Sequence, residues 1–152
     1  PGGWIESADD ITVDVTRDRL RGARDVFPDA PAYAAAGSLI DQGLAAGRLI
    51  FADPATRPTA VVAQSDLLAA GVIRAAEEAG LRVPQDVSVT GFDGIVVDGL
   101  APYELTTIVQ PTVEKGRAAG QAIVAMLRGE VAASIDFTCE FRAGNTTAPP
   151  TG

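Results

Sequence analysis

A carboxylate at the end of a predicted strand is the first group in this chain that is suited to binding chemistry. In "VSVTGFDG", residues 87–94, a buried strand is expected to lead into Asp93, which lies between Gly91 and Gly94. A carboxylate accepts strong hydrogen bonds from ligand hydroxyls, and glycines would let a ligand approach the backbone. The alternative is that Asp93 caps a turn, a common role for Asp among glycines, and the pattern leaves the two interpretations equal.

A second polar group, Gln64-Ser65-Asp66, follows directly after the apolar run "TAVVA". In open α/β sheets, ligands bind beyond the carboxyl ends of the strands. If the two strands are neighbours, Ser65 and Asp93 would therefore converge on one edge. The alternative is that Ser65 or Asp66 is the N-cap of the helix that follows, and the local pattern favours this second interpretation.

The residue inventory excludes several kinds of chemistry. The chain has no His, which removes His-based acid–base catalysis and His-ligated metal sites, and it has neither a G-x-G-x-x-G nor a G-x-x-x-x-G-K-[ST] motif. We therefore expect no metal, no cofactor and no catalytic residue. The single Cys139 cannot form an intrachain disulfide, which fits a reducing compartment.

Charge and hydropathy narrow the partners further. The net charge is −8, Lys115 is the only Lys, and the Arg residues are scattered along the chain. A surface that binds nucleic acid needs clustered Lys and Arg, so we expect none here. No apolar run approaches 18 residues, so we expect no membrane span.

Hydrophobic periodicity predicts helices that alternate with strands. Such alternation is typical of a parallel α/β sheet covered by helices on both faces. The run at 59–63 predicts a strand buried on both faces, and Gly116 and Gly120 predict a helix that lies close to a sheet. The tail from 145 suits a frayed end. Because the chain opens on a helix, we expect a further part to precede it. The predicted helices are 17–27, 40–51, 67–80 and 112–128, and the predicted strands are 32–36, 59–63, 86–90, 105–109 and 134–144.

Four segments together resemble the effector-binding region of the LacI/GalR family of bacterial transcriptional regulators. They are "RDRLRGARD", "RPTAVVAQSDLLAAGVIRAAEEAGLRVPQDVSVTGFDG", "LTTIVQPTVEKGRAAGQAIVAML" and "EFRAGNTTAPP". The resemblance covers nearly the whole chain. It implies a periplasmic-binding-protein-like fold, in which two Rossmann-like lobes hold a small effector, often a sugar or a nucleobase, in the cleft between them. Residues 1–152 would be mostly the C-terminal lobe, with about 105–127 returning toward the other lobe. The first lobe and the helix-turn-helix domain would lie outside this chain.

The same resemblance implies roles for four residues. Arg19 would clamp effector hydroxyls, although from the pattern alone it is a solvated helix charge. Asp93 would be the main acceptor, and Gln110 would face the cleft near the hinge. Ser65 stands where many members have Asn in an "A-N-D" motif, and Ser is shorter and offers fewer donors.

The function implied is control of operator DNA binding by a small ligand, such as a sugar or a nucleoside-like molecule. The ligand would favour one arrangement of the lobes in a cytoplasmic homodimer, whose subunits would meet around 68–79 and 95–100. DNA would be bound through the helix-turn-helix domain. One alternative is a secreted sugar-binding protein of a transporter, which shares the fold. Another is an α/β enzyme, against which the absence of His weighs.

Overall fold

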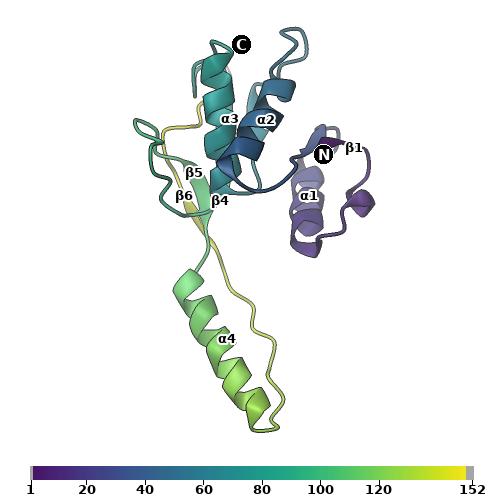
Figure 1. Ribbon diagram of the computed structural model, residues 1–152, viewed down its shortest axis with the longest axis vertical. Helices are drawn as coiled ribbons and strands as arrows, with labels where there is room; N and C mark the ends of the chain where they lie inside the picture. The colour runs from purple at the N-terminus through teal and green to yellow at the C-terminus, as the bar shows by residue number, and fades with distance from the viewer. Residues whose placement is uncertain (1, 150–152) are drawn as a thin grey trace.

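The centre of the molecule is a four-stranded sheet with the order β3-β4-β5-β6 (Figure 1). The computed structural model describes residues 2–149. Strands β3 (Ala60–Val62), β4 (Ser88–Asp93) and β5 (Thr106–Val109) are parallel, while β6 (Glu140–Arg142) runs antiparallel to β5. The predicted α/β fold class is confirmed. The last predicted strand is shorter than expected and reverses the direction of the sheet at its edge.

Two helices form one layer against this sheet. Helix α3 (Asp66–Glu78) packs on β4, and α2 (Ile40–Ile50) packs on α3. The predicted helices at 40–51 and 67–80 are confirmed, including the terminator Gly80, which has a φ of +73°. The core lies between α3 and the sheet, and its most deeply buried residues include Phe51, Ala69, Ile73, Val87 and Val89.

The contact between α2 and α3 depends on glycines. A Cβ atom on Gly47 would lie 2.5 Å from the Cβ of Ala75, and a Cβ on Gly71 would run into the backbone of Ile40 and Leu44. Backbone cannot yield as a flexible side chain can, so these positions admit no side chain. The two helices approach so closely because the glycines leave their facing surfaces bare.

We expect Gly71→Ala to destabilise the chain by about 2 kcal/mol, because overpacking against fixed backbone outweighs the gain in helix propensity of about 1 kcal/mol. Gly22→Ala is the matched control. Gly22 also lies within a helix, but nothing is within 4 Å of its missing Cβ, so propensity alone should raise stability. Urea unfolding of both variants measures the change in the free energy of unfolding, which should be negative for Gly71→Ala and positive for Gly22→Ala. A stabilising Gly71→Ala would contradict the close contact.

The N-terminal segment adds a small unit beside this body. Strands β1 (Gly3–Ile5) and β2 (Ala32–Ala34) pair antiparallel, and Trp4 meets Tyr33 edge to face with ring centroids 5.3 Å apart. Between these strands lie the short 3₁₀ helix η1 and helix α1, which starts earlier than the predicted 17–27. Their bounds are Ala8–Asp10 for η1 and Asp14–Val26 for α1.

Helix α1 lies on the face of the sheet opposite to α3. Successive side chains of a strand point to opposite faces. At Gly91 of β4 the Cβ direction meets Asp66 of α3, so the next residue, Phe92, points to the other face. There the guanidinium of Arg19, from α1, stacks over the Phe92 ring. Helices therefore lie on both sides of the strand ends.

Two local predictions about burial are wrong. Val62 is 61% exposed and Ala60, on the same face of β3, is exposed too, so this edge strand is covered on one face only. The tail is not frayed as far as residue 149. Thr146 is fully buried, and its hydroxyl donates to the carbonyl of Val89 at 2.7 Å while its own carbonyl accepts from the Val89 N–H at 2.8 Å. The predicted end of the tail, 150–152, lies outside the described residues.

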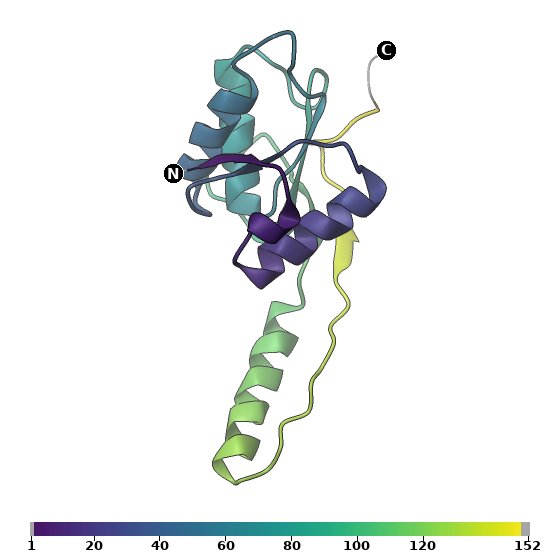
Figure 2. The same cartoon turned by 90° about the vertical axis from the view of Figure 1, so that its right-hand side faces the viewer.

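Helix α4 (Thr112–Leu127) stands away from the sheet, and the chain runs back beside it toward β6 (Figures 1 and 2). The helix was predicted at 112–128, but none of its residues is buried, and no atom lies within 4 Å of a Cβ placed on Gly116 or Gly120. The prediction that these glycines lie against this sheet is therefore wrong. No helix within residues 2–149 combines the length and apolar character needed to cross a membrane.

Candidate functional site

The carboxyl ends of the three parallel strands bring the predicted polar groups to one edge. Strand β3 pairs with β4, which confirms the condition for convergence, and Asp93 at the end of β4 is in register with Val109 at the end of β5. Ser65 lies three residues beyond β3, and Gln110 lies one residue beyond β5. This edge is where open α/β sheets bind their ligands.

Asp93 has an unusual backbone for a residue with a side chain. Its φ is +116°, and it is the only residue other than glycine with a positive φ in the described part of the chain. Such conformations cost about 1–3 kcal/mol and collect at functional sites. The carboxylate is half-buried and accepts from Gln110 Nε2 at 2.6 Å, and the carbonyl accepts from the Gln110 N–H at 3.2 Å. The side-chain partner of Asp93 thus lies just beyond β5 and not within a local turn.

The glycines beside Asp93 have a different role from the one predicted. A Cβ on Gly91 would collide with the Asp66 carboxylate, and one on Gly94 would lie 2.7 Å from the Cα of Val109. Both positions are filled on that side by protein atoms. The expectation that these glycines leave room for a ligand is therefore wrong, because their missing side chains allow close packing of α3 and β5.

Gln110 bridges two charged groups. Its Nε2 donates to Asp93, and its Oε1 accepts from Nζ of Lys115 at 2.6 Å. Lys115 lies in the first turn of α4, so the predicted site is connected to the helix that leaves the sheet. The sequence pattern did not identify Lys115 as part of the site, because it is the only Lys of the chain and the Arg residues are scattered.

Arg19 is not the free surface charge that its pattern suggests. Its Nη1 donates to the carbonyl of Gln64 at 2.8 Å, and its guanidinium carbon lies 3.7 Å from the centre of the Phe92 ring. A cation over an aromatic face is attracted by the ring quadrupole. Arg19 is therefore half-buried and tied to the ends of both β3 and β4, on the face opposite to α3.

Ser65 is the N-cap of α3, as the local pattern favoured. Its Oγ accepts from the N–H of Leu68 at 3.2 Å. The hydroxyl proton remains available as one donor. A ligand contact by Ser65 stays a prediction.

Sequence reasoning also missed the role of Asp66, which it offered only as a possible N-cap of the helix. Asp66 is fully buried, and its two oxygens accept from the Thr107 hydroxyl on β5 and from the Ile95 N–H, the latter at 2.8 Å. Its side chain thus joins the start of α3 to strand β5 and to the loop that follows Asp93. Its partners lie 29 and 41 residues further along the chain, so no local pattern could reveal them.

We expect Asp66→Ala to lower the free energy of unfolding by about 2–4 kcal/mol, since it leaves the buried Thr107 hydroxyl and the Ile95 N–H without their acceptor. Asp66→Asn is the matched control, because its amide oxygen can still accept from Ile95 and its NH₂ can donate to Thr107. Urea unfolding compares the two variants. If the Ala and Asn variants were equally stable, this network would not hold the strand ends.

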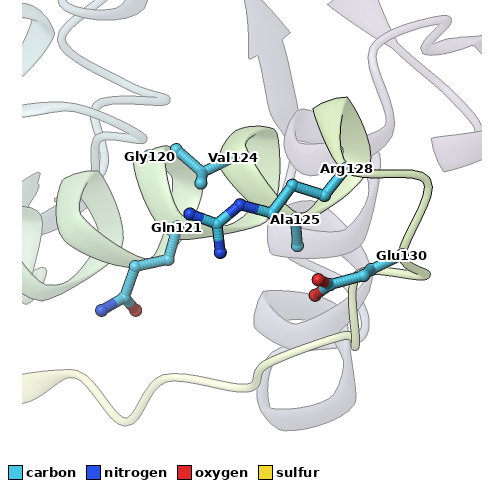
Figure 3. Close-up of a pocket in the computed structure, with 6 residues that line it drawn as sticks. All are labelled: Gly120, Gln121, Val124, Ala125, Arg128 and Glu130. Carbon is cyan, nitrogen blue, oxygen red and sulfur yellow. The ribbon is translucent and has the colours of Figure 1, made fainter.

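A hollow of about 420 Å³ lies elsewhere, along the far part of α4 (Figure 3). Its walls are Gly120, Gln121, Val124, Ala125, Arg128 and Glu130. None of these is a predicted site residue, and α4 buries none of its own residues. The hollow therefore reflects the uncovered state of this helix, and the strand ends remain the candidate site.

Comparison with known proteins agrees with this architecture. A family model for the periplasmic binding protein-like domain matches residues 10–140. The HTH-type transcriptional regulator IpsA of Corynebacterium glutamicum is 33% identical over 95% of this chain and 42% of its own length. The HTH-type transcriptional repressor CytR of Escherichia coli is 35% identical over 66% of this chain and 29% of its own length.

Solved structures give the same result. A LacI-family transcriptional regulator from Corynebacterium glutamicum superposes with a TM-score of 0.82 at 29% identity, covering 97% of this chain and 46% of that one. A LacI-family regulator from Lactobacillus casei with bound sucrose superposes with a TM-score of 0.61 at 28% identity, covering 72% and 41%. The chain belongs to the family of periplasmic binding protein-like domains, in the form found in LacI-type transcriptional regulators. It spans less than half the length of these curated relatives.

Proposed function

We propose that this chain is the ligand-sensing and dimerisation part of a bacterial LacI-type transcriptional regulator. A small polyhydroxylated ligand, such as a sugar, binds at the carboxyl ends of β3, β4 and β5. The observation that carries the proposal is Asp93, a carboxylate held in a strained conformation at the edge where the strand ends meet. Asp93 accepts from ligand hydroxyls, Arg19 donates to ligand oxygens from the opposite side, and Ser65 and Gln110 add contacts.

The second wall of the site comes from another lobe of the same protein. Support for this comes from α4, whose apolar side chains are uncovered, and from relatives more than twice as long as this chain. Burying such apolar area stabilises a contact by about 25 cal/mol per Å². Residues 105–109, which were also predicted to cross, belong to this lobe, because β5 lies inside its sheet. In the proposal, the chain crosses to the other lobe only after β5, and α4 packs against it. The uncovered apolar side chains of α4 include Val113, Ile123, Val124, Met126 and Leu127.

The mechanism is linkage without turnover. A ligand that binds the closed arrangement of two lobes more tightly than the open one shifts the equilibrium toward closure by its difference in affinity. In a cytoplasmic homodimer this shift changes the spacing of helix-turn-helix domains outside residues 1–152, and with it the affinity for operator DNA. The net charge of −8 disfavours contact between this chain and DNA, which is consistent with a division of roles in which this chain senses the ligand and another domain binds DNA.

Fewer residues are available for a subunit contact than the predicted ranges 68–79 and 95–100 contain. Residues of α3 from Ala69 to Ala76 are mostly buried against α2 and β4, so they cannot meet a second subunit. In the loop 95–100, Val96 is 89% exposed, whereas Leu100 is buried. We therefore limit the proposed subunit contact to the exposed part of this loop and the outer side of α3.

A secreted sugar-binding protein of a transporter is the second candidate, because it has the same fold. The relatives named above are transcriptional regulators, which favours the regulator. Binding of operator DNA by the intact protein, and its release or strengthening by ligand, separates the two candidates.

We expect a thermal-shift screen of the intact protein against glucose, sucrose, ribose, cytidine and glucose 6-phosphate to give a stabilising ligand. A ligand at a hundredfold its Kd adds about 2.7 kcal/mol of stability. Asp93→Ala should abolish the shift, while the control Asp29→Ala, which removes an exposed carboxylate from the loop between α1 and β2, should retain it. A shift that survives in Asp93→Ala would move the site elsewhere, and the absence of any shift would count against a sensor of these ligand classes.

A further inference from the structure

Lys115 occupies a position that helix stability does not explain. It is the fourth residue of α4, in the first turn, where the positive end of the helix dipole disfavours a cation. No carboxylate lies within ion-pairing distance of it among residues 2–149. Its recorded contact is the 2.6 Å hydrogen bond from Nζ to Oε1 of Gln110. A neutral or acidic side chain would suit this turn better, so the lysine is explained by its contact with Gln110.

The chemistry of the three groups admits only one order of hydrogen bonds. An ammonium group donates and never accepts, whereas an ionised carboxylate accepts and never donates. The amide of Gln110 has one accepting end and one donating end, so its Oε1 must face Lys115 and its Nε2 must face Asp93. The two distances, both 2.6 Å, fit charge-assisted bonds at each end. This orientation follows from the charges of Lys115 and Asp93 alone.

The backbone of Gln110 does not fix this amide by itself. Its N–H already bonds to the carbonyl of Asp93, but the side chain beyond Cα is only part-buried and can adopt several rotamers, so that fixing it costs conformational entropy. Lys115 holds the far end of the side chain. Without that contact, Nε2 would meet Asp93 only part of the time.

We infer that Lys115 is a positioning residue of the ligand site: through Gln110 it keeps one oxygen of Asp93 bonded and leaves the other for the ligand. This inference rests on the proposed function. Because the free oxygen can only accept, the ligand group opposite it must be a donor such as a hydroxyl. A phosphate or carboxylate in that place would face Asp93 with like charge and no proton to share. The site therefore selects neutral hydroxylated ligands over their phosphorylated forms at this contact.

The first test needs no ligand. Nuclear magnetic resonance of the deuterated intact protein follows the two Nε2 protons of Gln110, assigned by their loss in Gln110→Ala, with the exposed Gln85 as reference. In the wild type, the proton that donates to Asp93 should resonate downfield of its Gln85 counterparts. Lys115→Met should move it toward the Gln85 values, and Lys115→Arg, which still donates, should restore it. An unchanged resonance in Lys115→Met would overturn the inference.

The matched control is Arg117→Met, which removes one positive charge from an exposed position two residues along α4. If Lys115 acted only through net charge or through the helix, both Met variants would shift the Gln110 resonance alike, and the inference would fail. We expect the Arg117 variant to match the wild type.

The second test measures selectivity with the sugar that gives the largest thermal shift and with glucose 6-phosphate. Lys115→Met should weaken the sugar about tenfold, as expected for the loss of a hydrogen bond that orients a charged acceptor, while Lys115→Arg and Arg117→Met should retain affinity within about threefold. Equal affinity in Lys115→Met would overturn the role in binding. If no probe shifts the wild type, the proposed function fails, and the Gln110 resonance still decides whether Lys115 positions the amide.

Discussion

The buried carboxylate of Asp66 is the interaction on which the rest of the site depends. A carboxylate without water is stable only when its oxygens are satisfied, and here both are: one by the Thr107 hydroxyl and one by the Ile95 N–H. The side chain reaches these partners because Gly91 leaves a path beside β4. One group therefore joins the start of α3, strand β5 and the loop after β4. Ser65, Gln110 and Asp93 lie at the adjoining ends of these segments.

Around this fixed point the site is built from both faces of the sheet. The α3 side supplies the N-cap and the buried support, while α1 supplies Arg19 from the other face, stacked on Phe92 and bonded to Gln64. Gln64 in turn donates to the carbonyl of Thr16 in α1 at 3.2 Å, so helix and strand end hold each other. The polar groups of the proposed site are thus held by contacts within the protein, which a ligand would not need to make. Such preorganisation lowers the cost of ordering on binding.

The order of helices and strands from α1 onward could be predicted because most of these elements have a clear period and clear ends. The prediction that the chain opens on a helix was wrong, because β1 and η1 precede α1 and are too short to show a period. The sequence placed the predicted binding residues at one sheet edge on the condition that two strands are neighbours, and the pairing of β3 with β4 meets that condition. Burial could not be predicted in the same way. A compact apolar run looks alike in a central strand and in an edge strand, so the exposure of Val62 was not visible. The bonds of Thr146 to Val89 and of Asp66 to Thr107 join residues far apart in the chain, and no local pattern contains them. Likewise, the helical period of α4 predicted the helix but not that its apolar side chains would be uncovered in this chain.

The position of the Lys115 contact at the root of α4 has a mechanical consequence. A helix of 16 residues is about 24 Å long, at about 1.5 Å per residue. A tilt of about ten degrees at the root would carry its far end through about 4 Å. The root of the helix is bonded through Gln110 to Asp93, and its far end projects free of the sheet (Figure 1). A displacement too small to disturb the strand ends is therefore magnified at the far end of α4 into one comparable to the spacing of packed side chains.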